Sequence, residues 1–434
     1  MSTTVNFDLH KEMELLRLVT VGSVDDGKST LIGRLLVDTK GAFEDQLLAV
    51  RKAPHAIEDE DVALSARNID LAMLTDGLQA EREQGITIDV AYRYFSTPKR
   101  KFIMADCPGH EQYTRNMVTG ASTANAVIIL IDARNGVLTQ TRRHTHIIGL
   151  LGLPHLIVAV NKMDLVDYSE DVYNNIKDEL TEFCAKQNIH DLICIPASAL
   201  EGDMIVDRGD NMPWYEGETV LETLESLEVG DHVDEQEFRF PVQYVSRPQT
   251  KELPDFRGYM GRVVSGTVKK GDAVNILPAG HVSRVKEIVS FDGNLDEAFS
   301  PQSVAITLED DIDISRGDII VHAGHQLQSS KDIEAMVCWM GNEPLTARKK
   351  YHIKHTTNTC KAVIKDIVYH TDINTLEQDT NAEQLAMNEI GRVALKLQQP
   401  LNFDLFEGNH STGSFIIIDS FTNNTVGAGM ILKS

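Results

Sequence analysis

The sequence predicts an α/β domain with a mostly parallel sheet and helices on both faces, followed by two β-barrel domains. Up to about residue 225, short apolar segments alternate with segments of helical pattern, which is typical of a parallel sheet covered on both sides. Beyond about residue 238, short strand-like segments are separated by glycine, proline and aspartate, which favours β-barrels. We therefore expect domains at residues 1–227, 238–330 and 331–434.

The composition excludes several classes of protein. The chain has 434 residues and a formal net charge of −24, from 41 basic and 65 acidic side chains, which argues against broad nucleic-acid binding. No segment approaches the roughly 18 continuous apolar residues of a membrane helix, and residues 1–14 show no signal-peptide pattern. The five cysteines form no C-x-x-C pair, so we expect no disulfide framework and no zinc site. These features predict a cytoplasmic protein.

The first candidate site is a glycine-rich loop between an apolar strand at residues 15–21 and a helix. Its pattern, G-x-x-x-x-G-K-S, predicts a loop whose backbone N–H groups converge on phosphate oxygens. We expect Lys28 to reach the β- and γ-phosphates and the Ser29 hydroxyl to bind Mg²⁺. The residues predicted to contact the phosphates are Gly22, Ser23, Val24, Asp25, Asp26, Gly27, Lys28, Ser29 and Thr30.

A second loop, Asp106-Cys107-Pro108-Gly109-His110, follows the strand predicted at residues 101–105. Its Asp106 is placed to hold Mg²⁺ through water, and its Gly109 to offer a backbone N–H to a γ-phosphate. Upstream, we expect the Thr87 hydroxyl to bind Mg²⁺ and the Thr87 N–H to bind the γ-phosphate. Ordinary structure is the alternative for both segments: a turn at residues 106–109, and a strand at residues 88–95 that Thr87 merely precedes.

Two further loops predict guanine as the base. In Asn161-Lys162-Met163-Asp164, the Asp164 carboxylate can accept hydrogen bonds from the N1–H and exocyclic amine of guanine, whereas adenine has no matching donors. We expect Asn161 to tie this loop to the phosphate loop and the stem of Lys162 to cover the base. In the last loop, Ser198, Ala199 and Leu200, a backbone N–H is expected to meet the guanine O6.

Each of these four motifs alone is compatible with an ordinary turn. Their order, each at the end of a predicted strand within one α/β domain, predicts a site for GTP.

With R-E-x-G-I-T-I at residues 82–88 and D-C-P-G-H at residues 106–110, the chain resembles the translational-type GTPases, close to the elongation factors that carry aminoacyl-tRNA. This resemblance implies that His110 positions the attacking water, a role that fits its place directly after Gly109. Residues 261–268, G-R-V-V-S-G-T-V, resemble the second domain of these factors, and residues 413–419 resemble the last strands of their third domain.

Two positions differ from the elongation factors, which typically have His at the position of Ser23 and His or Ser at that of Asp26. The segments at residues 22–36 and 106–122 resemble instead the large, GTP-hydrolysing subunits of bacterial sulfate adenylyltransferases. That resemblance implies that GTP hydrolysis drives formation of adenylyl sulfate and pyrophosphate from ATP and sulfate. The adenylyl-transferring site would lie on a separate small subunit, in a heterodimer or higher assembly, and an adenylylsulfate kinase is a further candidate partner.

Two alternatives stay open from the sequence. The first is an elongation-factor-type carrier of aminoacyl-tRNA, against which the acidic balance and the two departures count. The second is a regulatory GTPase with some other partner.

Overall fold

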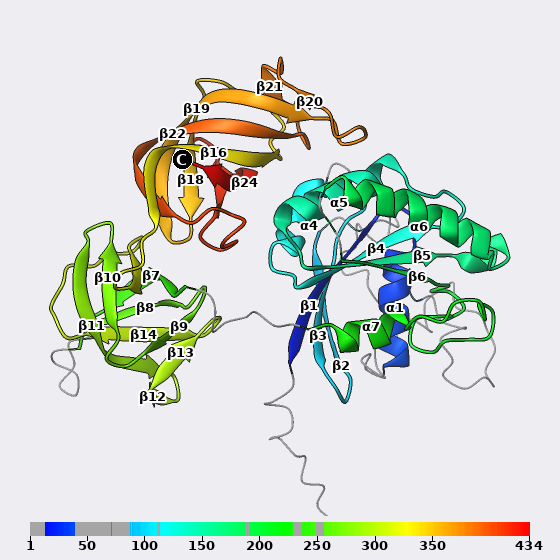
Figure 1. Cartoon of the computed structure of the whole chain (residues 1–434), viewed down its shortest axis with the longest axis horizontal. Coiled ribbons are helices and arrows are strands. Elements are labelled where there is room, and N and C mark those ends of the chain that lie inside the picture. The colour runs from blue at the N-terminus through cyan, green and yellow to red at the C-terminus, as the bar shows by residue number, and fades with distance from the viewer. Residues whose placement is uncertain are drawn as a thin grey trace, which may run out of the picture. The chain divides into compact units, whose positions relative to one another are not determined.

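The computed structural model describes residues 14–39, 71, 87, 89–110, 113–187, 189, 191–228, 237–248 and 256–434. The chain divides into two compact units, Met1–Val229 and Gly230–Ser434 (Figure 1). The division falls in the acidic segment that follows the predicted α/β domain.

The first unit is built on a six-stranded sheet in the order β2-β3-β1-β4-β5-β6. All neighbouring pairs are parallel except β2 and β3, which are antiparallel. This confirms the predicted, mostly parallel sheet. Its central strand β4 is buried at every residue because both faces are covered, whereas the edge strand β2 is partly exposed. The strands are β1 Leu15–Gly22, β2 Ala91–Ser96, β3 Lys101–Asp106, β4 Ala126–Asp132, β5 His155–Asn161 and β6 Leu192–Pro196.

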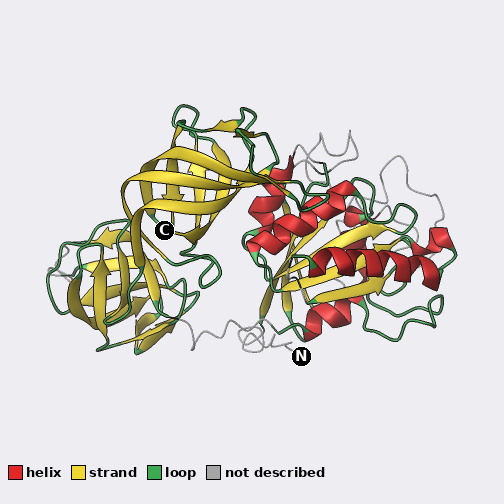
Figure 2. Ribbon diagram, turned by 45° about the horizontal axis from the view of Figure 1, so that its top comes forward, coloured by secondary structure: helices red, strands yellow, loops and turns green. Residues whose placement is uncertain are grey.

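Helices cover both faces of this sheet, as the sequence predicts. In Figures 1 and 2, α1 and α7 lie on one face and α4, α5 and α6 on the other. Among the described residues, no helix is both long enough and apolar enough to cross a membrane. The helices are α1 Lys28–Asp38, α4 Thr114–Ala121, α5 Thr139–Leu151, α6 Glu170–Ala185, α7 Val220–Ser226 and the short 3₁₀ helix η4 Met163–Val166.

One strand begins later than its sequence pattern suggests. The strand expected at residues 88–95 begins at Ala91. Residues 89 and 90, which follow the predicted nucleotide-binding segment, therefore precede the strand.

The second unit contains two antiparallel sheets that each close into a barrel, which confirms the predicted pair of β-barrels. In the first barrel the sheet order is β10-β15-β7-β8-β14-β11-β12, and pairing of β10 with β11 closes it. Its core includes Phe238, Phe240 and Tyr259, each of which is at most 1% exposed. The strands are β7 Arg239–Ser246, β8 Gly258–Arg262, β9 Thr267–Lys269, β10 Ala273–Leu277, β11 His281–Ser290, β12 Gly293–Leu295, β13 Glu297–Phe299, β14 Ser303–Leu308 and β15 Ile319–His322.

In the second barrel the sheet order is β18-β23-β24-β16-β22-β19-β20, and pairing of β18 with β19 closes it. Its core is packed around Trp339, Tyr351 and Phe403. The strands are β16 Gln328–Trp339, β17 Leu345–Thr346, β18 Lys350–His355, β19 Asn358–Thr371, β20 Gln378–Asp379, β21 Gln384–Leu385, β22 Ile390–Phe403, β23 Ser414–Ile418 and β24 Thr425–Lys433.

Polar side chains join the two barrels. The Arg239 guanidinium, at the start of the first barrel, donates to both carboxylate oxygens of Asp404, which follows β22 of the second, at 2.9 and 3.0 Å. The Asn409 amide donates to the Ser265 hydroxyl at 2.9 Å. The Arg239 side chain is 3% exposed, so this ion pair is shielded from water.

Candidate nucleotide-binding site

The four predicted loops follow β1, β3, β5 and β6. These strands are parallel, so their carboxyl ends meet at one edge of the sheet. Ligands of open parallel sheets bind at this edge.

The phosphate loop has a backbone that requires glycine at residue 27. Gly27 has a φ of +94°, and a β-carbon there would lie 2.4 Å from the Asn161 side-chain nitrogen. The positive φ would strain any other residue at this position, and a β-carbon would also force Asn161 to move. The loop then enters α1, whose first residue is Lys28.

Lys28 is held over the loop by two backbone carbonyls. Its ammonium donates to the carbonyl oxygens of Gly22 at 3.1 Å and Ser23 at 2.7 Å. Burial lowers the pKa of Lys28, and the nearby carboxylates of Asp106 and Asp26 oppose that shift. The cation is therefore fixed at the place where the sequence predicts contact with the phosphates.

Asp26 turns its side chain away from the solvent and under the same loop. Its carboxylate accepts the backbone N–H of Ser23 at 2.5 Å, and the residue is 2% exposed. The Ser23 hydroxyl is also buried and has no hydrogen-bond partner within the described part of the chain. Any contact of Asp26 with a phosphate would therefore be made by its backbone, while its carboxylate holds the loop.

The loop after β3 packs closely against the phosphate loop. The Thr20 hydroxyl donates to an oxygen of Asp106 at 3.4 Å, and the backbone N–H of Cys107 donates to the Thr20 carbonyl at 3.3 Å. A β-carbon on Gly109 would lie 2.6 Å from both the Gly22 carbonyl oxygen and the Lys28 ammonium nitrogen. Only glycine allows this approach, which brings the predicted γ-phosphate loop next to Lys28.

His110 and Thr87 are both half-buried. The His110 ring lies 6.1 Å from the ring of Tyr113, at 61° to its plane. Residues 82–86 and 88 of the R-E-x-G-I-T-I motif lie outside the described residues, as do residues 111 and 112. The roles of His110 and Thr87 in hydrolysis and nucleotide binding stay predictions.

The residues at this edge fit Mg²⁺ better than a metal held by protein alone. The described residues contain no group of three or more His, Cys, Asp and Glu side chains that could hold a metal. Mg²⁺ typically takes one or two carboxylates together with water and substrate phosphates. Asp106 and Ser29 supply one carboxylate and one hydroxyl beside the phosphate loop.

Asn161, at the end of β5, joins three loops. Its side-chain amide donates to the Asp26 carbonyl at 2.8 Å, and its side-chain oxygen accepts the backbone N–H of Ala199 at 2.9 Å. The residue is 2% exposed. The contact expected from the sequence between Asn161 and the phosphate loop is thus present, and the same side chain also holds the loop after β6.

Asp164 is oriented by the loop after β6. The Ser198 hydroxyl donates to one Asp164 carboxylate oxygen at 2.6 Å and accepts the backbone N–H of Glu201 at 3.2 Å. This chain of bonds fixes one side of the carboxylate. The arrangement suits recognition of two adjacent donors on a planar base.

The loops after β5 and β6, which are expected to bind the base, are here called the base loops. Two contacts at these loops were not predicted from the sequence. Lys162 has a φ of +62° and its ammonium bonds Asp132 at 2.9 Å and the Asp25 carbonyl. Burial alone would raise the pKa of Asp132, but hydrogen bonds from Arg134 and Lys162 bring that pKa down to about 2. Asp132 is the last residue of β4. Because functional side chains of such a sheet gather at the ends of its strands, its position in the sequence could have indicated it.

Arg34 is the second unpredicted contact. This α1 residue is 4% exposed, and its guanidinium donates to the Ala199 carbonyl at 3.0 Å and to the Leu200 carbonyl. It thereby holds the loop expected to meet the guanine O6. Arg34 lies within the segment at residues 22–36 that carries the family resemblance, but that segment gives no indication of its contact with the loop after β6.

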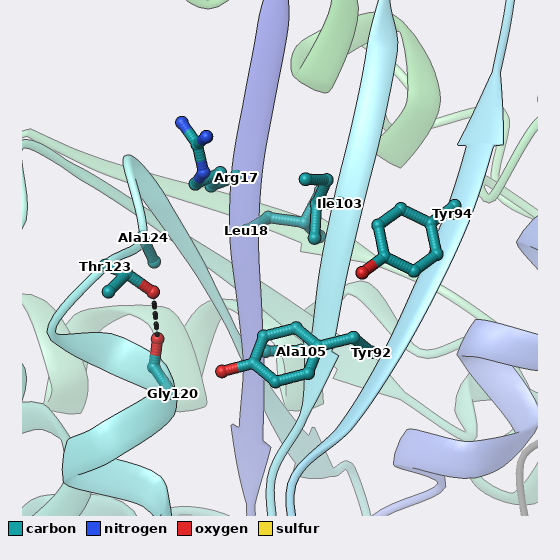
Figure 3. A pocket seen from close by; sticks show the side chains of 9 residues that line it. All are labelled: Arg17, Leu18, Tyr92, Tyr94, Ile103, Ala105, Gly120, Thr123 and Ala124. Carbon is teal, nitrogen blue, oxygen red and sulfur yellow. Dashed lines mark hydrogen bonds between the residues drawn. The ribbon is translucent and has the colours of Figure 1, made fainter. Parts of the chain in front are cut away.

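A separate pocket of about 200 Å³ lies on the α4 side of the sheet, away from these loops (Figure 3). The Tyr92 and Tyr94 rings, from β2, stand over it, and the end of α4 forms the opposite wall. None of the predicted nucleotide-binding residues lines this pocket. The lining residues are Arg17, Leu18, Tyr92, Tyr94, Ile103, Ala105, Gly120, Thr123 and Ala124.

The fold and the four loops agree with three family models. The Elongation factor Tu GTP binding domain matches residues 13–237, Elongation factor Tu domain 2 matches residues 259–321, and the GTP-eEF1A C-terminal domain-like model matches residues 332–432. Together they define the class: a GTP-binding protein with an elongation-factor-type GTPase domain and two barrels. Two solved structures of sup35 also match, each with a TM-score of 0.44. The structure with GMPPNP is 22% identical and covers 99% of this chain, and the structure with GDP is 21% identical and covers 100% of this chain. In both cases 97% of the sup35 chain is covered.

Much higher identity is found with curated relatives. A protein of Aliarcobacter butzleri named sulfate adenylyltransferase subunit 1 is 54% identical over 423 residues, 97% of this chain and 88% of the relative. The protein of the same name from Bacteroides fragilis is 53% identical over 98% of this chain and 87% of the relative. The chain belongs to the sulfate adenylyltransferase subunit 1 family. A protein of Rhodopirellula baltica named bifunctional enzyme CysN/CysC is 52% identical over 98% of this chain and 64% of the relative.

Proposed function

We propose that this chain is the GTP-hydrolysing subunit of a sulfate adenylyltransferase. Its GTPase cycle would drive formation of adenylyl sulfate and pyrophosphate from ATP and sulfate. The observation that carries the proposal is identity above 50% to subunits of that name over nearly the whole chain. Asp164, whose carboxylate is oriented by the Ser198 hydroxyl, supports guanine as the base.

The adenylyl-transfer reaction would take place on a separate small subunit. The sequence has one phosphate loop, and the base loops beside it suit guanine, so the chain offers no second site of this kind for ATP. The words "subunit 1" in the names of the relatives imply a partner for those proteins. We propose a heterodimer or higher assembly in the cytoplasm. An adenylylsulfate kinase is a candidate further partner, which the bifunctional name of the Rhodopirellula baltica relative supports.

Hydrolysis of GTP would depend on positioning more than on covalent chemistry by the protein. Lys28 would hold the β- and γ-phosphates, and the Gly109 N–H would meet the γ-phosphate. His110, next in the chain, would orient the attacking water. Ser29, Thr87 and Asp106 would hold Mg²⁺, which when bound neutralises charge on the phosphates.

The remaining nucleotide contacts belong to the phosphate and base loops. We assign backbone contacts with the phosphates to the loop residues, and contacts with the base to the loops after β5 and β6. The phosphate-loop residues are Gly22, Ser23, Val24, Asp25, Asp26, Gly27 and Thr30, and the base-loop residues are Asn161, Lys162, Asp164, Ser198, Ala199 and Leu200.

Coupling to GTP has a physical reason. Formation of adenylyl sulfate from ATP and sulfate is steeply uphill, so a second, favourable reaction is needed to draw it forward. Loops that contact a γ-phosphate can adopt one arrangement with GTP and another with GDP. We propose that the segments around Thr87 and Gly109 transmit this difference to the small subunit. We also propose domain boundaries at residues 1–227, 238–330 and 331–434. The division of the chain between residues 229 and 230 supports the first of these boundaries.

The test is GTP turnover by the purified chain, measured alone and with its small subunit, ATP and sulfate. We expect turnover to rise when all three are present. Turnover that is unchanged by the small subunit and its substrates would contradict the proposal.

A further inference from the structure

Asp26 places a buried negative charge directly beneath the phosphate loop. The residue is 2% exposed, and its carboxylate accepts the backbone N–H of Ser23 at 2.5 Å. A β-carbon at Gly22 would lie 3.2 Å from the same carboxylate oxygen, so the carboxylate fills the space under the loop. The backbone of Asp132 also favours the ionised carboxylate and so lowers the pKa of Asp26, against the effect of burial, which raises it.

The charged groups around Asp26 come from two elements. Lys28, at the start of α1, is the cation that faces it, and Asp132, at the end of β4, is a second anion. Lys28 is also near Asp106, and Asp132 is itself paired with Arg134 and Lys162. The Lys28 ammonium is therefore attracted by the carboxylates of both Asp106 and Asp26.

We propose that the buried Asp26 carboxylate sets the affinity of this site for guanine nucleotides. Its negative charge would weaken the hold on the phosphates, so that GDP leaves faster than it would from the same loop with a neutral side chain. The Asp26 side chain thus has a positioning role: its carboxylate acts through the loop backbone and Lys28, and does not itself touch the nucleotide. The inference rests on the guanine-nucleotide part of the proposed function and needs no assumption about sulfate.

The direction of the effect follows from the electrostatics. The phosphate groups of a bound nucleotide are anions and would lie above a loop that has Asp26 below it. Repulsion between buried charges is weakly screened, whereas the loop's N–H groups would bind phosphate equally well over a neutral side chain. Burial raises the pKa of Asp26 and Lys28 opposes that shift, so the carboxylate becomes protonated as the pH falls and the repulsion is then lost.

Two neutral variants of the full-length chain test this inference. Asp26→Asn keeps an oxygen to accept the Ser23 N–H, and Asp26→Ser offers a smaller acceptor. Asp178→Asn is the matched control, because it removes one carboxylate from an exposed position on α6. GDP affinity is measured by calorimetry, and release is followed with a fluorescent GDP, at several pH values between 5.5 and 8.5.

At pH 7.5 we expect at least one Asp26 variant to bind GDP about three- to thirty-fold more tightly than the wild type and to release it more slowly. The ratio of wild-type to variant dissociation constants should shrink wherever the wild-type carboxylate takes up a proton as the pH falls, because burial raises the pKa of Asp26. Asp178→Asn should bind as the wild type does.

Equal or weaker GDP binding by both variants would overturn the inference, since Asp26 would then only support the loop. Failure of both variants to fold would also overturn it, because the carboxylate would be needed for the fold. A wild-type chain that binds no guanine nucleotide would instead contradict the proposed function. These outcomes are distinguishable in the same titrations.

Discussion

The side-chain amide of Asn161 donates a hydrogen bond to the backbone carbonyl of Asp26 at 2.8 Å. One residue thereby connects the loop expected to bind the base with the loop expected to bind the phosphates. Its side-chain oxygen accepts the Ala199 N–H, so the loop after β6 is held as well. The three loops form one buried hydrogen-bonded unit.

Replacing Asn161 with alanine should weaken GDP binding about ten- to hundred-fold. The change leaves the buried Asp26 carbonyl and Ala199 N–H without these partners, at a combined cost to nucleotide binding of about 1–3 kcal/mol. Calorimetric titration with GDP measures the loss. Thr181→Ala, on the exposed side of α6, is the control and should bind normally. Unchanged affinity in Asn161→Ala would show that the loops are held by other contacts.

Replacing Asp164 with asparagine should change the preferred base. Guanine presents donors to the carboxylate, whereas an asparagine amide can donate to the carbonyl group that xanthine carries in place of the guanine amine. A site built around one hydrogen-bond pattern discriminates strongly against the other. We expect GTP affinity to fall by about 100-fold or more and xanthosine triphosphate to bind better than GTP. Competition binding of the two nucleotides measures the preference; retained selectivity for GTP would count against the role of Asp164.

Arg34 should matter for both nucleotide binding and stability. Arg34→Ala leaves the Ala199 and Leu200 carbonyls without a charged donor, at a cost of about 2–3 kcal/mol in unfolding free energy. Denaturant unfolding and GDP titration measure the two effects. Arg34→Lys should recover only part of the lost stability and of the lost GDP affinity, because an ammonium cannot reproduce the planar guanidinium that donates to both carbonyls. Full recovery by lysine would mean that charge alone suffices.

The ion pair around Asp132 predicts a pH dependence. Hydrogen bonds from Arg134 and Lys162 hold the folded-state pKa of Asp132 at about 2, against an ordinary value of about 3.9. A depressed pKa of an acid contributes stability that is present above pH ~4 and is lost as the pH falls toward 2. Asp132→Asn should therefore be less stable than the wild type at pH 7, and the difference should narrow between pH 4 and pH 2. A difference that does not change over this range would contradict the assignment.

The buried pair between the barrels should stabilise the second unit. Arg239→Ala removes the cation from Asp404 and should cost about 3 kcal/mol, whereas Arg392→Ala breaks a half-exposed pair with Glu334 and should cost under about 1 kcal/mol. The chain has two tryptophans, so a Trp214→Phe background leaves Trp339, in the second barrel, as the fluorescent reporter. Equal losses in the two variants would show that burial of the Arg239 pair is not important.

Much of this architecture could be predicted from the sequence, because apolar runs and glycine-rich turns are local signals. The strand at residues 15–21 and the glycine-rich loop that follows it are predicted directly from such signals. The parallel sheet then requires the four loops to meet at one edge. The start of β2 was expected at residue 88 but lies at Ala91.

Contacts between distant residues could not be predicted in this way. Arg34 reaches the loop after β6 across 165 residues of sequence, and nothing near Arg34 indicates its partner. The orientation of Asp26 is a similar case: the pattern predicts a residue of the phosphate loop, but only the folded chain shows its carboxylate beneath that loop. Residues 82–86, which carry part of the motif around Thr87, lie outside the described residues.

The most direct test of the proposed function is adenylyl sulfate formation by the complex of this chain with its small subunit. With the wild-type chain, we expect GTP to stimulate formation of adenylyl sulfate from ATP and labelled sulfate, and a non-hydrolysable GTP analogue not to sustain it. With Asp164→Asn, xanthosine triphosphate should replace GTP as the stimulating nucleotide, which would locate the effect at this site. Adenylyl sulfate formation that is indifferent to GTP with the wild-type chain would contradict the central claim.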